Sequence, residues 1–216
     1  AAEIPILGGV ALAAGLAIAA ALLSAVLAPA LFLAVLAFYY VATFAYSLVL
    51  KRKLMIDILT LAGLYTLRIL GGAAAAAITL SPWMLAFSMF LFLALAAVKR
   101  QAELVDQQRS GKDRTAGRGY RTADMPVMLG MALSAGNAAV LVFALYVYSP
   151  NVAALYGRPE FLWLVCPLLL YWISRMVIVA HRGVMTDDPI VYAATDRVSQ
   201  AVVALAALVV VAGSIL

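Results

Sequence analysis

The sequence predicts an all-α integral membrane protein, because it is strongly apolar and its apolar residues occur in blocks of membrane-spanning length. Of its 216 residues, 67% are hydrophobic and 12% are charged, whereas soluble domains contain about 45–50% apolar residues. A spanning helix needs about 20 apolar residues, so the chain accommodates about seven spans in one helical domain, residues 1–216. The one cysteine, Cys166, lies in an apolar block, which excludes a disulfide framework.

Each boundary between apolar blocks coincides with a helix-breaking or polar segment. Pro29 separates the first two blocks, Lys51-Arg52-Lys53 follow the second, and Ser81-Pro82 turn the chain after the third. A long charged segment, residues 99–125, follows the fourth block. The seven expected spans are residues 6–28, 31–50, 54–77, 83–98, 126–148, 161–180 and 198–216.

The basic residues are distributed unevenly over the two faces of the membrane that these spans define. Residues 51–53, 99–125 and 181–197 reach one face, whereas the opposite face carries Arg158 as its only basic residue. Since Lys and Arg accumulate in cytoplasmic loops, we expect the first face to be cytoplasmic and the protein to be multi-pass. The basic residues of the first face are Lys51, Arg52, Lys53, Lys99, Arg100, Arg109, Lys112, Arg114, Arg118, Arg121, Arg182 and Arg197.

Carboxylates accompany these cations on the same face. We call the opening that these segments form at the membrane surface the mouth. A mouth that combines carboxylates and cations can hold a divalent metal ion with a phosphorylated ligand, because Mg²⁺ takes one or two carboxylates and completes its shell with phosphate and water. Lys and Arg side chains then neutralise the phosphates. The carboxylates in question are Glu103, Asp106, Asp113, Asp187, Asp188 and Asp196.

The third span contains two ionisable residues, Asp57 and Arg68. They are eleven residues apart, so they share a helix face and are separated by about 16 Å along the axis. An arginine near mid-membrane costs at least a few kcal/mol unless it has a partner or faces a polar cavity. Arg68 is therefore either a structural residue satisfied by carbonyls or a carboxylate, or a cation that helps to bind an anionic substrate.

The central charged segment has a helical pattern in its first half. Lys99, Glu103, Asp106 and Gln107 recur at spacings of three and four, so they share one face if the fourth helix continues past the membrane. A solvated helix end with intrahelical ion pairs explains the same pattern. In the second half, glycines flank Arg118 and allow close approach of the backbone to a ligand.

Two further groups have alternative explanations. Tyr46, Lys51 and Arg52 close the second span, either as anchors whose charged ends reach the headgroups or as part of the mouth. Asp187 and Asp188 precede Pro189, where adjacent carboxylates either form a helix-capping turn or reach a metal together.

Three segments, in this order, resemble the UbiA superfamily of intramembrane prenyltransferases, and most closely its decaprenyl-phosphate phosphoribosyltransferase branch. They are residues 46–73 (YSLVLKRKLMIDILTLAGLYTLRILGGA), 99–107 (KRQAELVDQ) with 117–120 (GRGY), and 181–199 (HRGVMTDDPIVYAATDRVS). The family fold has nine transmembrane helices around a cavity open to the cytoplasm, with two Asp-rich motifs for Mg²⁺ and diphosphate. The first motif, NDxxDxxxD, is not in this sequence. We therefore expect the seven spans to match the family's helices three to nine, in a chain truncated at its N-terminus.

The resemblance implies a Mg²⁺-dependent transferase in the bacterial cytoplasmic membrane. Where other members have DxxxD, this sequence has Lys99, Arg100, Glu103 and Asp106, which implies transfer of phosphoribose from phosphoribosyl diphosphate to a polyprenyl phosphate lipid. The alternative is prenyl transfer from a prenyl diphosphate to an aromatic or other small acceptor. A transporter with the same mouth is disfavoured because the halves show no inverted repeat. No nucleic acid partner is implied.

The resemblance also suggests roles for individual residues, with Mg²⁺ as the cofactor. The expected catalytic residues are Asp57, Glu103, Asp187 and Asp188. The expected substrate-binding residues are Tyr46, Lys51, Arg52, Arg68, Lys99, Arg100, Arg118 and Tyr120. The expected metal ligands are Glu103 and Asp106.

Overall fold

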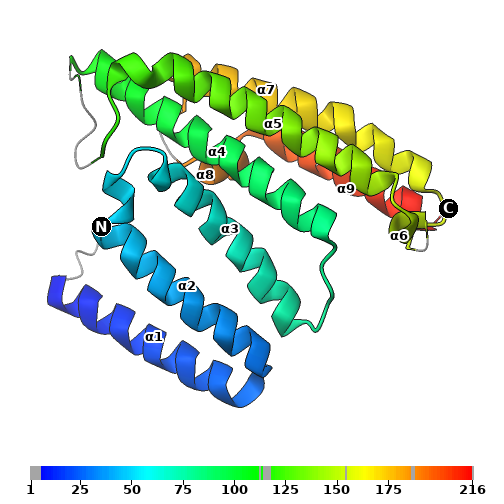
Figure 1. Ribbon diagram of the computed structural model, residues 1–216, viewed down its shortest axis with the longest axis horizontal. Coiled ribbons are helices and arrows are strands. Elements are labelled where there is room, and N and C mark those ends of the chain that lie inside the picture. The colour runs from blue at the N-terminus through cyan, green and yellow to red at the C-terminus, as the bar shows by residue number, and fades with distance from the viewer. Residues whose placement is uncertain (1–5, 112, 114–117, 154, 186–187, 216) are drawn as a thin grey trace.

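The computed structural model describes residues 6–111, 113, 118–153, 155–185 and 188–215, and within these ranges it contains helices and turns but no strands (Figure 1). The α-helices are α1 (Ile6–Leu27), α2 (Ala30–Leu48), α3 (Ile56–Ala75), α4 (Pro82–Arg109), α5 (Met125–Val147), α6 (Pro150–Ala153), α7 (Val165–His181), α8 (Pro189–Thr195) and α9 (Arg197–Ile215). Short 3₁₀ turns cover Leu50–Arg52, Thr122–Asp124 and Pro159–Leu164.

Six of the described helical segments are long and apolar enough to cross a membrane. They comprise α2, α3, α4, α5 with the turn before it, α7 with the turn before it, and α9. The all-helical membrane fold expected from the sequence is therefore confirmed. Helix α1 corresponds to the first expected span, but the count of seven and the correspondence to helices three to nine stay predictions.

Local sequence signals explain where several helices begin. The Ser81 hydroxyl accepts a hydrogen bond from the Trp83 N–H at 3.2 Å, and Pro82 occupies the first turn of α4. Asp188 caps α8 in the same way, accepting from the Ile190 N–H at 3.0 Å, with Pro189 next in sequence. A capping oxygen satisfies an amide that has no intrahelical acceptor, and proline lacks that amide, so both fix the helix start.

Small residues allow the helices to pack closely around α4, which contacts α3, α5 and α7. Ala97 of α4, Ala132 of α5 and Ala180 of α7 are fully buried in one apolar cluster. At Gly136 of α5, a Cβ would lie 2.5 Å from the Cγ2 of Ile173 in α7. Tight contact through small side chains is the usual basis of helix association in membranes, so this packing fixes α4 in the bundle.

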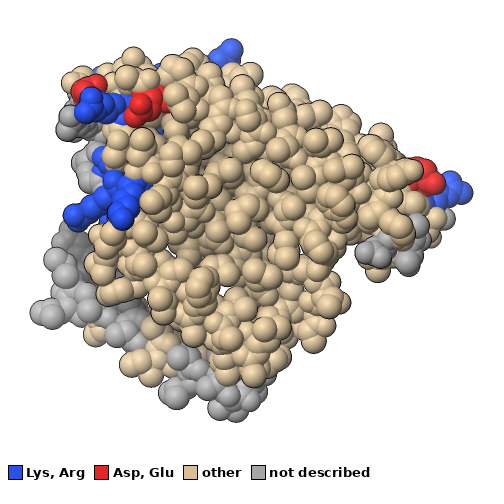
Figure 2. Space-filling model, viewed as in Figure 1, with Lys and Arg blue, Asp and Glu red and all other residues tan. Residues whose placement is uncertain are grey.

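One end of the bundle carries most of the charge. Helix α4 has 28 residues, which gives it a length of about 42 Å, so its last turns extend beyond a hydrocarbon core of about 30 Å. The turn Leu50–Arg52 and the start of α5 lie at the same end in Figure 1. Figure 2 shows charged side chains mainly at the two ends of the visible face, with a broad uncharged surface between them. We call the end with the C-terminus of α4 the charged end.

Candidate functional site

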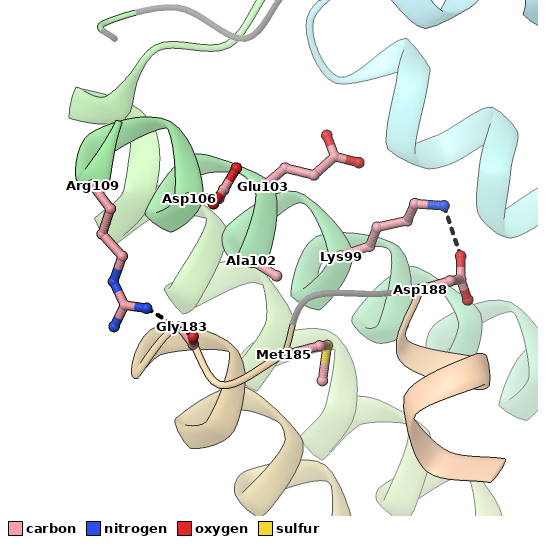
Figure 3. A pocket seen from close by; sticks show the side chains of 8 residues that line it. All are labelled: Lys99, Ala102, Glu103, Asp106, Arg109, Gly183, Met185 and Asp188. Carbon is pink, nitrogen blue, oxygen red and sulfur yellow. Dashed lines mark hydrogen bonds and ion pairs between the residues drawn. The ribbon is translucent and has the colours of Figure 1, made fainter. Parts of the chain in front are cut away.

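The last turns of α4 form one wall of a cavity of about 460 Å³ at the charged end (Figure 3). Four charged residues of α4 follow one another at spacings of three or four along this wall, which confirms that the helix continues past its apolar part and presents a charged face. The lining residues are Lys99, Ala102, Glu103, Asp106, Arg109, Gly183, Met185 and Asp188.

Lys99 and Asp188 close one end of the cavity. The Lys99 Nζ lies 2.7 Å from the Asp188 Oδ2, and both side chains are partly exposed. The other carboxylate oxygen of Asp188 caps α8. The ion pair therefore ties α8 to α4, and Asp188 is occupied by two protein contacts. Asp187, the neighbouring expected catalytic residue, lies outside the described residues.

Arg109 lies at the other end of the cavity, on the last turn of α4. Its Nη1 donates to the carbonyl of Gly183 at 2.8 Å, and its Nη2 donates to the carbonyl of Arg182 at 2.6 Å. Gly183 has φ +63°, and a Cβ there would lie 2.4 Å from the guanidinium carbon. This close approach requires glycine. Arg109 was not among the expected site residues, although its spacing of three from Asp106 places it on the same helix face.

Beside the cavity, five side chains form a set of hydrogen bonds and ion pairs that we call the Asp57 network: Tyr46, Asp57, Arg100, Glu103 and Arg118. The Tyr46 hydroxyl donates to the Asp57 Oδ1 at 2.9 Å, and the Arg100 Nη2 lies 2.7 Å from the Asp57 Oδ2. Arg118 reaches both carboxylates, with Nη1 3.2 Å from Asp57 Oδ1 and Nε 3.6 Å from Glu103 Oε2. Arg100 also pairs with Glu103 through Nη1.

The Asp57 network is balanced in charge, with two guanidinium groups facing two carboxylates. The side chains of Asp57 and Arg100 are completely buried, whereas Arg118 keeps 22% of its side chain exposed. Burial acts to lower the pKa of Arg118, but the charges of Glu103 and Asp57 outweigh it and raise that pKa above its ordinary value. Arg118 is therefore firmly cationic and is the accessible cation of the network.

The segment with Gly119 and Tyr120 packs on the turn between α2 and α3. A Cβ at Gly119 would lie 3.2 Å from the Arg52 carbonyl oxygen, so this glycine allows a close approach to the protein's own backbone. The Tyr120 hydroxyl accepts from the Met55 N–H at 3.1 Å, and Met55 has the unusual φ of 65°. Burial raises the pKa of Tyr120, so the hydroxyl stays protonated at neutral pH. This packing places Arg118 over Asp57.

Some expected substrate-binding residues do not line the cavity. Arg100 and Tyr120 are completely buried, because Arg100 faces Asp57 and Glu103 and its guanidinium lies 5.4 Å from the Tyr120 ring centre. Neither residue lines the cavity, and their expected contact with a substrate stays a prediction. Lys51 and Arg52 lie on the 3₁₀ turn after α2 and also are not lining residues.

Arg68 occupies a different environment, within the membrane. Its Nε and Nη2 donate to the Tyr39 hydroxyl at 3.1 and 2.8 Å, and its guanidinium lies 4.7 Å from the ring centre of Tyr65. It lines an apolar groove of about 220 Å³ between α2 and α3. The partners are thus a hydroxyl and aromatic rings, where the sequence had suggested carbonyls, a carboxylate or a substrate.

The fit of a divalent metal depends on Glu103 and Asp106. Among the described residues, no group of three or more His, Cys, Asp or Glu side chains could hold a metal ion. Glu103 and Asp106, one turn apart, nevertheless supply two carboxylates on the cavity wall. This pair suits an ion of the Mg²⁺ type that enters with a diphosphate and takes its remaining ligands from phosphate and water.

The fold and the site define a helical membrane protein with a charged cavity of about 460 Å³ at the end of its longest described helix. The sequence matches the model of the UbiA prenyltransferase family over residues 2–193, and the chain belongs to that family. Members of this family are prenyltransferases and generally use divalent metal ions. The resemblance to the UbiA superfamily that the sequence segments suggested is therefore confirmed.

Two bacterial relatives resemble this chain over most of its length. An uncharacterized protein, y4nM, of Sinorhizobium fredii is 36% identical over 163 residues, which cover 74% of this chain and 31% of the relative. Nodulation protein NoeC of Azorhizobium caulinodans is 42% identical over 143 residues, which cover 66% of this chain and 46% of the relative. The chain thus matches less than half the length of each.

Proposed function

We propose that this protein transfers phosphoribose from phosphoribosyl diphosphate to a polyprenyl phosphate. The observation that carries the proposal is the arrangement of charges in the cavity. Lys99, paired with Asp188, lies at one end, Arg109 lies at the other, and Glu103 and Asp106 lie between them (Figure 3). Phosphoribosyl diphosphate is anionic at both ends, with a phosphate on C5 and a diphosphate on C1. A prenyl diphosphate is anionic at one end only and would leave half of this polar cavity without a partner.

The proposed reaction is a substitution at the anomeric carbon of the ribose. An oxygen of the lipid phosphate forms a bond to C1, the bond between C1 and the diphosphate oxygen breaks, and the diphosphate leaves with the electron pair. Glu103 and Asp106 would hold the divalent ion, which neutralises charge on the diphosphate. Lys99 and Arg118 lie beside these carboxylates and bind phosphate oxygens. Catalysis then depends on orientation and charge neutralisation.

The Asp57 network supplies the orientation. Asp57 accepts a hydrogen bond from Tyr46 and forms ion pairs with Arg100 and Arg118. These contacts fix the position of the Arg118 guanidinium relative to Glu103. Breaking a buried ion pair costs about 3–5 kcal/mol. The buried Arg100 and Tyr120 therefore act in substrate binding by holding the binding residues in place.

We place the charged end at the cytoplasmic face. The support is the concentration of Lys and Arg in the segments that meet there, since cytoplasmic loops accumulate these residues. A phosphorylated sugar donor is water-soluble and is made inside the cell, so this orientation gives it direct access to the cavity. The lipid phosphate enters from the adjoining leaflet.

Prenyl transfer to a small acceptor is the second candidate. It is favoured by apolar grooves along α2 and α3, one of about 220 Å³ that contains Arg68 and one of about 400 Å³ lined by Phe38, Leu64 and Leu70 among others. Such grooves suit an isoprenoid chain. A polyprenyl phosphate also has such a chain, however, so the grooves fit both candidates and the charged cavity separates them.

Titration calorimetry with the full-length protein in detergent tests the donor. With Mg²⁺ present, we expect phosphoribosyl diphosphate to bind more tightly than a prenyl diphosphate. Ribose 5-phosphate and inorganic diphosphate should each compete with it, because each fills one end of the cavity. Tighter binding of the prenyl diphosphate would contradict the assignment and favour prenyl transfer.

A further inference from the structure

Arg109 differs from the nearby cations Lys99, Arg100 and Arg118 in how its charge is balanced. Lys99 pairs with Asp188, and Arg100 and Arg118 pair with Asp57 and Glu103. In the described chain, the hydrogen-bond partners of the Arg109 guanidinium are the neutral carbonyls of residues 182 and 183, and no ion pair joins it to a carboxylate. Among the residues that the structure describes, Arg109 therefore presents to the cavity a positive charge that is not paired with a carboxylate.

The two carbonyl contacts also hold Arg109 in one orientation. A guanidinium has five N–H donors, and these contacts occupy two of them, so three remain for a ligand. The carbonyls belong to the end of α7, and Gly183 lets the guanidinium lie directly against the backbone. A planar donor group fixed in advance loses little entropy on binding and matches the geometry of a phosphate.

The position of Arg109 along α4 identifies the part of the ligand that it meets. Ten residues separate it from Lys99, which corresponds to about 15 Å along the helix axis. Figure 3 shows Glu103 and Asp106 between these two cations, with Ala102 and Met185 also lining the cavity. If a divalent ion and a diphosphate lie at the Glu103 end, a second anionic group of the same ligand lies near Arg109.

We propose that Arg109 is the specificity-determining residue of the site and binds the phosphate on C5 of the donor. This inference rests on the proposed function. A prenyl diphosphate has no second anionic group, so Arg109 selects donors that carry one. The alternative is that Arg109 only caps the C-terminus of α7, where a cation also interacts favourably with the helix dipole.

Two fragments of the donor separate these roles. Inhibition constants for ribose 5-phosphate and for inorganic diphosphate are measured with the full-length wild type and with Arg109→Gln. We expect the affinity for ribose 5-phosphate to fall about ten- to a hundred-fold, as for the loss of one charge-assisted contact. The affinity for diphosphate should change less than about three-fold, because diphosphate binds at the Glu103 end.

Arg197→Gln is the matched control, since Arg197 is an exposed arginine outside the cavity lining. It should leave both constants unchanged. Arg109→Lys keeps the charge and should recover much of the affinity for ribose 5-phosphate, although a lysine cannot bridge both carbonyls. If Arg109→Gln fails to fold, Arg109→Lys carries the test, and the expected result is a smaller loss of affinity that is confined to ribose 5-phosphate.

Equal losses for both fragments, or no loss for ribose 5-phosphate, would overturn the role of Arg109. That outcome is distinct from failure of the proposed function. If the proposed function fails, the wild type itself binds a prenyl diphosphate more tightly than phosphoribosyl diphosphate. If only the role of Arg109 fails, the wild type still prefers phosphoribosyl diphosphate, and the assignment of its C5 phosphate to Arg109 is wrong.

Discussion

The charged end contains two arrangements of arginine that differ in charge balance. In the Asp57 network, Arg100 and Arg118 face Asp57 and Glu103, and the pair formed by Asp57 and Arg100 is completely buried. At the other end of the cavity, Arg109 is exposed and bonded to two neutral carbonyls. The first arrangement satisfies its own charges, whereas the second leaves a charge for a ligand.

The comparison suggests that the buried arginine stabilises the site and that the exposed arginine is available to bind a ligand. A buried, balanced pair is costly to break and therefore fixes the position of its members. An exposed cation held by neutral groups keeps its attraction for anions. We therefore infer that burial separates the roles of neighbouring arginines. The buried Arg100 fixes the position of its partners, whereas the partly exposed Arg118 and the exposed Arg109 are available to a ligand.

The largest effect is expected from Asp57→Ala. This change leaves the buried Arg100 without its main partner, so we expect a destabilisation of about 3–5 kcal/mol. Thermal unfolding in detergent measures it. Asp188→Asn is the matched control, because it keeps a side-chain oxygen for the cap of α8 and breaks only an ion pair that is partly exposed and worth about 0–1 kcal/mol. Equal shifts for the two variants would mean that the Asp57 network does not fix the site.

Glu103→Gln should affect turnover more than folding. Glu103 lines the cavity and is 29% exposed, so the variant keeps the packing but loses a carboxylate for the metal ion. We expect activity to fall by more than about ten-fold, with a higher requirement for Mg²⁺. Assays over a range of Mg²⁺ concentrations test this. Near-normal activity at limiting Mg²⁺ would show that Glu103 only pairs with arginine.

Arg118→Ala should mainly weaken donor binding, whereas Arg100→Ala should mainly lower stability. Arg118 is partly exposed, so its loss should weaken binding of phosphoribosyl diphosphate by roughly ten- to a hundred-fold with little change in stability. Arg100 is buried, so its loss should mainly lower the unfolding temperature. Calorimetry and thermal unfolding of both variants make the comparison. A larger binding defect in a stable Arg100→Ala protein would reverse the two roles.

The smallest effect is expected at the junction of α7 and α9, away from the cavity. Asp196 accepts two hydrogen bonds from Arg175, at 2.6 and 3.0 Å, which hold the pKa of Asp196 below its ordinary value. A lowered folded-state pKa stabilises the protein above the unfolded-state pKa, and this contribution disappears as the pH falls through the folded-state value. Asp196→Asn should therefore cost at most about 1 kcal/mol at pH 7 and nothing at strongly acidic pH.

Unfolding of the wild type and Asp196→Asn between pH 7 and the acid limit of the fold measures this difference. Convergence of the two proteins at acidic pH is the expected result. A constant difference at every pH would show that the variant disturbs packing and that charge plays no part. Trp172 and Ser199, which are hydrogen-bonded to each other beside Asp196, are the packing groups concerned.

Helical periodicity explains which parts of the site the sequence could predict. Spacings of three and four placed Lys99, Glu103 and Asp106 on one face of α4, and the structure places all three on the cavity wall. The same reasoning could not orient Arg100, which is rotated by about 100° from Lys99. Whether Lys99 or Arg100 points toward Asp57 depends on how α4 packs against α3 and α5.

Arg109 and Tyr120 show a second limit of the sequence. The carbonyls that hold Arg109 belong to Arg182 and Gly183, which follow α7 and lie 73 and 74 residues further along the chain, and their position depends on the positive φ of Gly183. Likewise, Tyr120 bonds to Met55, 65 residues away. Contacts of this kind depend on the three-dimensional packing of distant helices and leave no local pattern.

The central claim, transfer of phosphoribose to a lipid, is tested most directly by following a radiolabel in the ribose of phosphoribosyl diphosphate. The full-length protein is incubated in vesicles with Mg²⁺ and polyprenyl phosphate, and the lipid fraction is extracted with organic solvent. We expect label in a polyprenyl product with the wild type, and a strong reduction with Glu103→Gln. Absence of lipid label with the wild type, together with incorporation of a labelled prenyl diphosphate into a small acceptor, would contradict the account.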